Sequence, residues 1–328
     1  MKLEKILDRA GDGGGLSFEE TVSLLSLDPD SKEMPELLDT AHEASRLWTS
    51  GRGHIWASIG VDCIPCPISC SFCSHGEKWG IVKDRWALST EEVVDRIHLY
   101  DVPEVRWISI RTTEFYPIED MVRIARLAGP LDCAQLVANT GEYTLETAQA
   151  LHEAGFNMAY HVMRLREGMD TGVDRTVRMR TLKAVQASPL ELSSLVDPVG
   201  PEHTNEEIAE SILTHRALGA TLMGVMARFA VPGTPKFDLG TISPSRLAQI
   251  TAVVRLAVGK QAHAICTHPS DERIVRSGAN TVVLEYGAIP RDTSVSPGEW
   301  RGITVEKAAQ LLRNAGYEVG NGAPHTQA

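Results

Sequence analysis

The sequence predicts a (β/α)8 TIM-type barrel with an N-terminal helical extension, and three observations lead to this fold class. Short apolar segments recur between residues 55 and 287 at intervals of about 30 residues. Helix-like segments lie between them, and several begin at Ser, Thr or Asn and end at Gly, as helices commonly do. Polar clusters follow the apolar segments, where such a barrel keeps its working residues. A doubly wound open sheet is the alternative architecture.

The N-terminal region is expected to be helical. Ser17 and Glu20 form a capping-box pattern ahead of an apolar run, and a second helix is expected over 35–50. The expected strands are residues 55–61, 105–111, 134–140, 158–164, 190–196, 222–229, 262–266 and 281–287, and the expected helices between them are residues 89–100, 144–155, 174–186, 204–219 and 243–259. We therefore predict an extension over 1–50, a barrel over 51–318 and a disordered tail over 319–328.

The composition excludes several classes of function. The formal net charge is -11, and the Lys and Arg residues are scattered, so there is no basic footprint for nucleic acid or an anionic membrane. The chain has no run of 18 apolar residues, and its N-terminus carries charges where a signal peptide needs an apolar core. We therefore expect a cytoplasmic protein that acts on a small molecule, without a nucleic-acid or membrane partner.

Four of the six cysteines lie within CIPCPISCSFCSHG, residues 63–76, which we call the cysteine loop. In a reducing compartment, clustered thiols are metal ligands more often than disulfides. Cys66, Cys70 and Cys73 form a C-x3-C-x2-C pattern, and the second distant pair of a structural zinc site is missing. Three thiolates on one tight loop suit a [4Fe–4S] cluster whose fourth iron is open. A zinc or adventitious metal loop is the alternative.

At these residues the sequence resembles the radical S-adenosylmethionine (SAM) enzymes, whose signature is C-x3-C-x2-C with an aromatic residue, here Phe72, before the third cysteine. VMARFAVPGTPKFD, ALHEAGFN and SGANTVV extend the resemblance over about residues 50–292 to biotin synthase and its relatives. Those relatives include hydrogenase-maturase, methylornithine-synthase and archaeal-type lipoyl synthase enzymes.

The resemblance implies an activity and its cofactors. In this family the open iron binds the amino and carboxylate groups of SAM. Reduction of the cluster then cleaves SAM to methionine and a 5'-deoxyadenosyl radical, which abstracts hydrogen from a substrate. The resemblance also implies an electron donor such as ferredoxin or flavodoxin. A closed barrel suits this chemistry because it excludes water from a reactive radical.

The resemblance assigns residues to SAM as well. It places Glu114 near the ammonium group, Glu167 near the ribose hydroxyls and Phe72 near the adenine. Arg178 matches the arginine that pairs with the SAM carboxylate, and Arg166 is a candidate for the carboxylate of SAM or substrate. The alternatives are a solvated loop glutamate for Glu114, a helix-surface arginine for Arg178 and a core phenylalanine for Phe72.

Polar residues at other strand ends are candidates for a substrate pocket, namely His161, Arg164, Asp197, His268, Glu285 and Arg291. We expect His268, Glu285 and Arg291 to come from loops that meet at one barrel mouth, where they would bind a zwitterionic or carboxylate ligand. The alternatives are salt bridges among these residues at the rim and a core role for His161.

Biotin synthase holds a second, [2Fe–2S] cluster with cysteines from three of its strands, and the corresponding stretches WISIRTTEF, LVANTGEY and ELSSLVDPVG contain none. Sulfur donation by that route is therefore not expected. Cys63 and Cys266 are candidates for an auxiliary iron–sulfur cluster, and buried structural thiols are the alternative.

Taken together, these features predict a radical SAM enzyme whose substrate radical rearranges, fragments or accepts sulfur. A lipoyl synthase-type sulfur insertion with an auxiliary cluster and a non-catalytic cluster carrier or maturation protein are the competing hypotheses.

Overall fold

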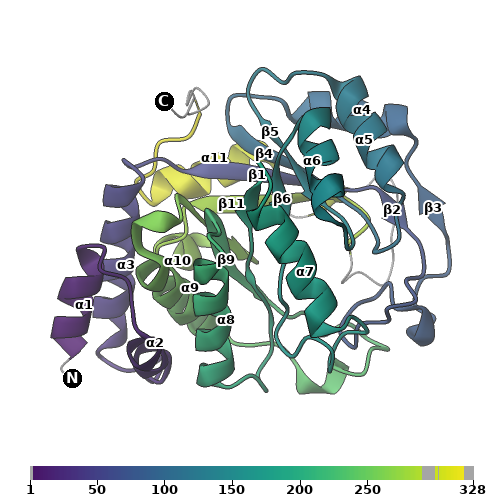
Figure 1. Cartoon of the computed structure of the whole chain (residues 1–328). Coiled ribbons are helices and arrows are strands. Elements are labelled where there is room, and N and C mark those ends of the chain that lie inside the picture. The colour runs from purple at the N-terminus through teal and green to yellow at the C-terminus, as the bar shows by residue number, and fades with distance from the viewer. Residues whose placement is uncertain (1–2, 290–299, 302, 321–328) are drawn as a thin grey trace.

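The computed structural model describes residues 3–289, 300–301 and 303–320, and its centre is a closed parallel barrel (Figure 1). The barrel strands in spatial order are β1 (His54–Gly60), β4 (Val105–Arg111), β5 (Gln135–Asn139), β6 (Phe156–Tyr160), β7 (Glu191–Ser193) continued by β8 (Val196–Val199), β9 (Leu222–Ala227), β10 (Ala264–His268) and β11 (Thr281–Gly287). Strand β11 pairs in parallel with β1 and closes the ring, so the open-sheet alternative is wrong.

Alternate residues of each strand face the barrel interior and the surrounding helices. On β1, Ile55 and Ile59 join the large core between strands and helices, whereas Trp56 belongs to a separate interior cluster. Trp107 of β4 lies in that same interior cluster, with its ring centroid 6.0 Å from that of Trp56. Two tryptophans therefore fill the lower interior, and the smaller and polar side chains at the carboxyl ends of the strands leave room for a cavity.

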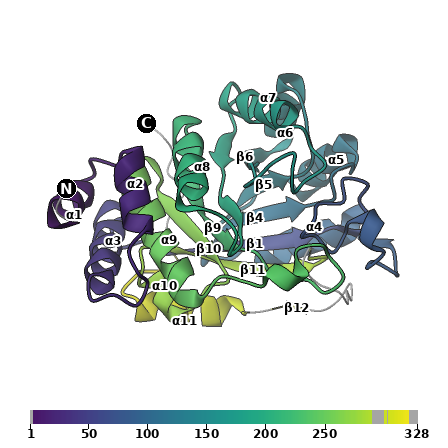
Figure 2. The same cartoon turned by 90° about the horizontal axis from the view of Figure 1, so that it is seen from below.

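Helices surround the barrel on its outer side (Figures 1 and 2). They are α4 (Thr90–Tyr100), α5 (Ile118–Ala128), α6 (Leu145–Ala154), α7 (Arg175–Gln186), α8 (Asn205–Ala217), α9 (Pro244–Val258), α10 (Glu272–Val275) and α11 (Val305–Asn314). The five helices expected between the strands are present, and α4 and α8 begin with complete capping boxes at Ser89 and Thr204. Helices α5, α10 and α11 were not expected from the sequence.

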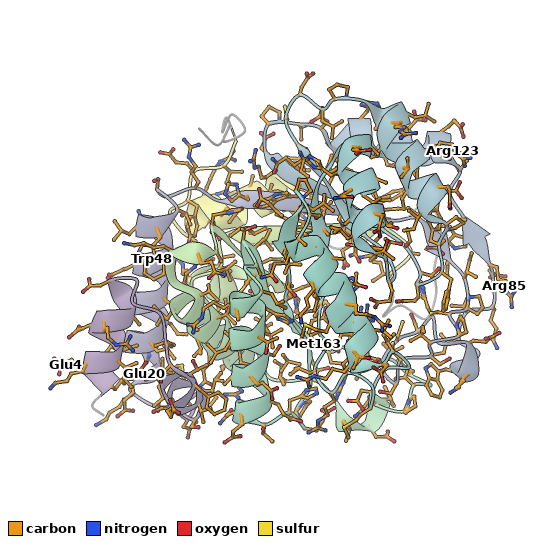
Figure 3. All side chains as sticks on the ribbon, in the orientation of Figure 1. Glu4, Glu20, Trp48, Arg85, Arg123 and Met163 are labelled. Carbon is orange, nitrogen blue, oxygen red and sulfur yellow. The ribbon has the colours of Figure 1, made fainter. Side chains whose placement is uncertain are left out.

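Three helices precede the first strand, namely α1 (Leu3–Gly11), α2 (Phe18–Leu25) and α3 (Met34–Trp48). The predicted capping box of α2 is confirmed, because the Ser17 side chain accepts from Glu20 N and the Glu20 side chain accepts from Ser17 N. These helices pack against α8 and α9 at one side of the barrel (Figures 1 and 2). Charged residues such as Glu4, Arg85 and Arg123 lie at the periphery of the molecule, whereas Met163 is buried (Figure 3).

Short elements decorate the barrel. Strands β2 (Asp62–Cys63) and β3 (Trp86–Ala87) form a two-stranded sheet around the cysteine loop, and β12 (Trp300–Arg301) pairs antiparallel with β11. Single 3-10 turns are η1 (Glu77–Trp79), η2 (Phe237–Leu239) and η3 (Gly259–Gln261). Among the described residues, no helix combines the length and the apolar character that crossing a bilayer requires.

Two strand predictions need correction. The strand expected over 158–164 instead runs from Phe156 to Tyr160. Its pairing with β5 ends at Ala138 and its pairing with β7 ends at Ser193, whose carbonyl accepts from His161 N at 3.0 Å. The strand expected over 190–196 is split, and its second part continues to Val199. Ser194 separates the two parts, with its hydroxyl donating to His161 O at 2.7 Å. Arg291 and residues 321–328 of the expected tail lie outside the described residues.

Candidate functional site

The cysteine loop leaves the carboxyl end of β1 and folds back on itself. Cys66 N donates to His75 O at 2.6 Å, and Glu77 N donates to Cys66 O at 3.0 Å. Within this ring, Cys73 N donates to Cys70 O at 3.0 Å, and the Trp79 indole N–H donates to the same carbonyl at 3.1 Å. Most of the polar backbone around the three cysteines is therefore used within the loop, which leaves their thiols available to a ligand.

The segment after β6 clamps the loop from outside. The backbone N–H and the hydroxyl of Ser71, between the second and third cysteines, both donate to Asp170 O, at 2.8 and 3.0 Å. Gly172 lies so close to the loop that a Cβ at this position would be 2.5 Å from Ile68 O. Because only glycine fits at such a distance, close packing against the cysteine loop requires glycine at position 172.

A chain of ion pairs extends this clamp to the cavity wall. Lys236 Nζ lies 2.8 Å from Asp170 and 3.4 Å from Glu202, and Glu202 also pairs with Arg228. Asp170, Glu202 and His203 are close enough to hold a metal ion. However, two cations neutralise these carboxylates, and His203 Nδ1 accepts from Gly200 N at 2.8 Å. We interpret the group as a cross-link between loops.

A cavity of about 230 Å³ opens at the carboxyl ends of the strands, and Cys66, Cys70 and Cys73 all line its mouth. Phe72 and Glu114 lie beside them, and Trp56, Met226 and Val283 line its apolar part. Cys266 also faces this cavity, whereas Cys63 and Cys133 are not among its lining residues. The cavity therefore joins the three thiols of the motif to the interior of the barrel.

The spacing of the three thiols distinguishes between metals. A tetrahedral zinc ion with Zn–S bonds of 2.3 Å brings its sulfur ligands to about 3.8 Å from one another. Among the residues that the structure describes, the one set of three donor atoms within 4.8 Å of one another is the group at Asp170, so the three thiols do not all lie within 4.8 Å of one another. A [4Fe–4S] cluster, in which each thiolate would bind a different iron, suits such a spacing better than a single zinc ion.

Burial affects the protonation of these cysteines. It raises the pKa of Cys70 to about 11 and that of Cys73 to about 12, and it also raises the pKa of Cys66. Without a metal, the thiols are therefore protonated at neutral pH. Because a metal binds the thiolate, loading of the site must release these protons.

One wall of the cavity is built from β1, β4, β10 and β11. Arg111 Nη1 lies 2.9 Å from Glu285 Oε1 and donates to Ser58 Oγ at 3.1 Å. His268 Nε2 lies 3.5 Å from Glu285 Oε2. The rim pairing that the sequence left open is therefore present between His268 and Glu285. It gives this wall a compact set of donors and acceptors with little net charge.

The facing wall comes from β6 and β8. The Tyr160 hydroxyl donates to Asp197 Oδ2 at 2.6 Å, and Arg164 lies near enough to Asp197 for that carboxylate to raise its pKa against the effect of burial. All three side chains line the cavity. A small molecule inside the barrel would thus meet polar groups on two sides and apolar side chains below.

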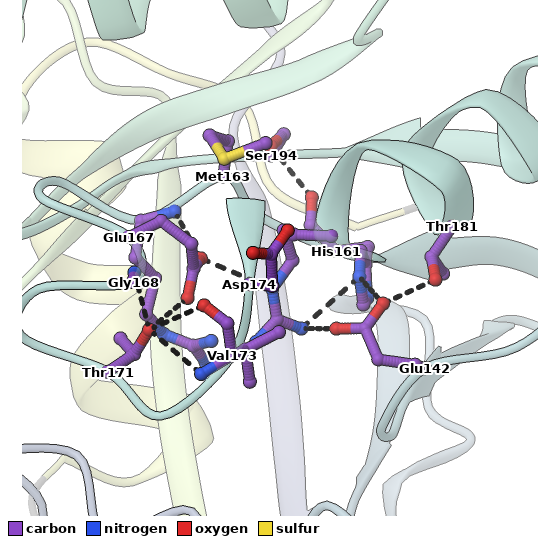
Figure 4. A network of polar contacts seen from close by, with 12 residues as sticks. Glu142, His161, Met163, Glu167, Gly168, Thr171, Val173, Asp174, Thr181 and Ser194 are labelled. Carbon is purple, nitrogen blue, oxygen red and sulfur yellow. Dashed lines mark hydrogen bonds and ion pairs between the residues drawn. The ribbon is translucent and has the colours of Figure 1, made fainter. Parts of the chain in front are cut away.

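Behind the cavity mouth lies a buried polar network (Figure 4). Arg178 of α7 pairs with Glu142, and its Nε donates to Glu167 Oε2 at 3.2 Å. Its Nη1 is also 3.3 Å from His161 Nε2, which in turn lies 3.2 Å from Glu142 Oε2. The side chain of Arg178 is 3% exposed, so the helix-surface alternative for this residue is wrong.

The predicted site residues fall into three groups. Phe72, Glu114, His268 and Glu285 line the cavity with the three cysteines of the motif. His161, Glu167 and Arg178 lie in the network behind its mouth. Arg166 is outside both groups, because its guanidinium pairs with Glu207 at 2.7 Å and donates to Glu202 O.

Sequence reasoning missed several polar residues of the site, namely Arg111, Glu142, Tyr160 and Arg228. Arg111 and Glu142 stood in polar clusters that follow strands, and that position was a usable signal. Tyr160 gave no such signal, because the strand was expected to continue past it. The role of Arg228 depends on its ion pair with Glu202, which the sequence does not reveal.

Comparisons with known proteins agree with this geometry. No model of a known protein family matches the sequence. The chain is 25% identical to biotin synthase 1 of Corynebacterium diphtheriae over 76% of its own length and 73% of that protein. It is also 25% identical to biotin synthase of Acidothermus cellulolyticus, over 75% of each chain.

The chain is thus similar to biotin synthases over about three quarters of its length, in line with the resemblance to radical SAM enzymes that its cysteine motif carries. Its fold is shared by methylornithine synthase (PylB), with a TM-score of 0.80 at 17% identity over 96% of this chain and 97% of that one. HydG, a maturase of the [FeFe]-hydrogenase, follows with a TM-score of 0.73 at 15% identity over 95% of this chain and 74% of that one. The similarity to biotin synthases is in line with the [4Fe–4S] cluster and the SAM that the cysteine motif predicts.

Proposed function

We propose that Cys66, Cys70 and Cys73 hold a [4Fe–4S] cluster and that the protein binds SAM at its open iron to abstract hydrogen from a small polar molecule. When bound and reduced by a donor such as ferredoxin or flavodoxin, the cluster supplies the electron that cleaves SAM to methionine and a 5'-deoxyadenosyl radical. The protein itself binds and orients the two ligands and excludes water.

One observation carries the SAM part of this proposal. Arg178 Nη2 and Glu114 Oε1 are both buried and have no hydrogen-bond partner among the described residues. Burial raises the pKa of Glu114, and the nearby charge of Arg178 opposes that rise. A buried donor and a buried acceptor without partners are costly, so a ligand that satisfies both is favoured.

The amino-acid end of SAM has the chemistry to satisfy these two atoms. Its carboxylate would accept from Arg178, and its ammonium group would donate to the carboxylate of Glu114. Phe72 lines the same mouth and would offer apolar contact to the adenine. Glu167 remains a candidate for the ribose hydroxyls, although its carboxylate already accepts from Arg164 N at 2.9 Å.

The barrel interior supplies the substrate site. Tyr160 and Asp197 face the wall that holds Arg111, Glu285 and His268, with Trp56 below. The ion pairs on these walls offer donors and acceptors with little net charge, which favours a neutral or zwitterionic molecule. We therefore propose a small polar substrate that lies between the two walls and directly below SAM.

The positions of the remaining cysteines favour a single iron–sulfur cluster per chain. Cys63 lies on β2 with its side chain buried outside the cavity, whereas Cys266 belongs to the interior cluster around Trp56. Two thiols in separate environments do not form a shared ligand set. We accordingly propose rearrangement or fragmentation of the substrate radical in preference to sulfur insertion from an auxiliary cluster.

Anaerobic reconstitution with iron and sulfide, reduction with dithionite and chromatography of the products test this function. We expect 5'-deoxyadenosine and methionine from SAM in equal amounts. Purified protein that holds zinc, or cluster-loaded protein that cleaves no SAM with any reductant, would refute the proposal. A protein that holds the cluster but binds no SAM would support the cluster-carrier hypothesis.

A further inference from the structure

Two carboxylates from different loops hold Arg178. Glu142 follows β5 and pairs with Nη1, whereas Glu167 follows β6 and accepts from Nε at 3.2 Å. The two contacts use two edges of the planar guanidinium group and leave Nη2 as its free edge. The orientation of Nη2 is therefore set by Glu142 and Glu167, which bind the other two edges of the guanidinium group.

Glu142 is itself held in place. The Thr181 hydroxyl, one turn along α7 from Arg178, donates to Glu142 Oε2, and His161 Nε2 lies 3.2 Å from the same oxygen (Figure 4). Burial raises the pKa of Glu142, but the hydrogen bond and charge of His161 and the charge of Arg178 outweigh it, and the net pKa falls to about 2. Glu142 is thus an anion throughout the neutral range.

Neither Glu142 nor Arg178 is among the residues that line the cavity, but the charge of Arg178 acts on Glu114, which does line it. We therefore expect an effect of Glu142 on a ligand to pass through Arg178. Glu167 has a second task, because it also accepts from Arg164 N and from the Thr171 hydroxyl. Glu142 and His161 both contact Nη1, and of these two residues Glu142 forms the ion pair that opposes rotation of the guanidinium group about the Glu167 contact. Loss of its charge would leave Arg178 in place but without a defined direction for Nη2.

We propose that Glu142 is the positioning residue that aims Arg178 at the carboxylate of SAM, an inference that rests on the proposed function. Neither Glu142 nor its partner Thr181 touches SAM. Their contribution is to fix a donor before the ligand arrives, which raises affinity because less freedom is lost on binding.

The test measures SAM binding by titration calorimetry on anaerobically reconstituted, unreduced protein, so that no turnover occurs. Glu142→Gln removes the charge and keeps the size of the side chain, and we expect the Kd for SAM to rise roughly tenfold. Decarboxylated SAM, which lacks the group that Arg178 would bind, should bind to both proteins equally. Glu210→Gln is the matched control. Glu210 lies on α8 and pairs with Arg175, which is on α7 like Arg178 but is exposed at the surface.

A second background shows whether the effect passes through Arg178. In an Arg178→Met protein, Glu142→Gln should change the Kd for SAM by less than about twofold. If Glu142→Gln destabilises the fold, Thr181→Val serves in its place. It removes the hydroxyl that donates to Glu142 and accepts from Tyr143 N at 3.4 Å, and we expect the Kd for SAM to rise about threefold.

Several outcomes would overturn the inference. A folded Glu142→Gln protein with an unchanged Kd for SAM would do so, and so would equal weakening of SAM and decarboxylated SAM. An undiminished effect in the Arg178→Met background would also contradict it. If the wild-type holoenzyme binds no SAM, the proposed function fails first and this inference with it.

Discussion

The proposed ligand set depends on individual thiols and their surroundings. Cys66, Cys70 and Cys73 share the mouth of one cavity, Cys266 lines the same cavity from β10 beside Trp56, and Cys63 is buried outside it. Cys133 is not among the residues that line the cavity and precedes β5 in the chain. The same residue type therefore serves as a proposed ligand in one place and as an apolar core residue in another.

Substitution of each motif cysteine tests this division. We expect about four irons per wild-type chain after reconstitution. Cys66→Ser, Cys70→Ser and Cys73→Ser should each lose most of the iron, because two thiolates hold a cluster poorly. Colorimetric iron and sulfide assays measure the result. Cys133→Ser is the control, and loss of iron in Cys63→Ser or Cys266→Ser would instead indicate an auxiliary cluster.

At the scale of elements, the N-terminal helices are joined to the barrel by buried polar contacts. Gln249 of α9 is fully buried, and its amide donates to Leu24 O at 2.8 Å and to Leu27 O at 2.9 Å. Arg216 of α8 donates to Leu16 O at 2.9 Å. These contacts satisfy carbonyls at the end of α2 and in the adjoining loops, so the extension behaves as part of the barrel's own helical layer.

Gln249→Ala tests this attachment. The substitution would remove the donor to Leu27 O and leave Leu24 O with only the longer bond from Leu27 N at 3.4 Å. We expect a loss of about 3 kcal/mol in the free energy of unfolding. Urea denaturation followed by circular dichroism measures it. Gln310→Ala, which removes a surface contact with Asn314, should change that free energy by less than about 0.5 kcal/mol. Equal effects of the two substitutions would show that the attachment of α2 does not depend on Gln249.

At the scale of the whole molecule, the architecture suits the confinement of a radical. Trp56 and Trp107 fill the barrel below the cavity, and the cysteine loop lies over its mouth. The loop is held by segments that follow β6 and β9 as well as by its own hydrogen bonds. A reactive species made at the loop would therefore meet the substrate before it meets bulk water.

The stability of the whole fold should depend on a buried histidine of α8. His215 is fully buried, Met163 N donates to its Nε2 at 3.3 Å, and burial lowers its pKa from 6.5 to about 4. A group whose folded pKa is lowered in this way binds protons more readily in the unfolded chain. Its contribution to stability is therefore complete above pH 6.5 and declines as the pH falls toward 4.

Chemical denaturation at two pH values measures this contribution. Between pH 7.5 and pH 5 we expect His215 to account for about 2 kcal/mol of lost stability. The His215→Gln side chain still accepts from Met163 N but does not titrate. The free energy of unfolding of the variant should therefore fall by about 2 kcal/mol less than that of the wild type over the same pH range. Parallel pH curves for the two proteins would contradict the assignment.

The sequence by itself determined the barrel class and the three cysteines of the motif. Both signals are local, since strand and helix periodicity are read over a few residues and the three proposed ligands lie within eight positions. The capping boxes of α2 and α4 also follow from four-residue patterns. The ends of β6 and β8 were misjudged, because they depend on which neighbouring strand offers a partner.

Only the tertiary structure decided which polar residues act together. Glu142, Glu167 and Arg178 come from two loops and a helix, and Tyr160 meets Asp197 across 37 positions of sequence. Their contacts depend on closure of the barrel, which sets the direction of every side chain at the carboxyl ends of its strands. The three proposed ligands could be selected from spacing alone, whereas the polar groups that we propose to orient SAM and enclose the substrate could be recognised only in the closed barrel.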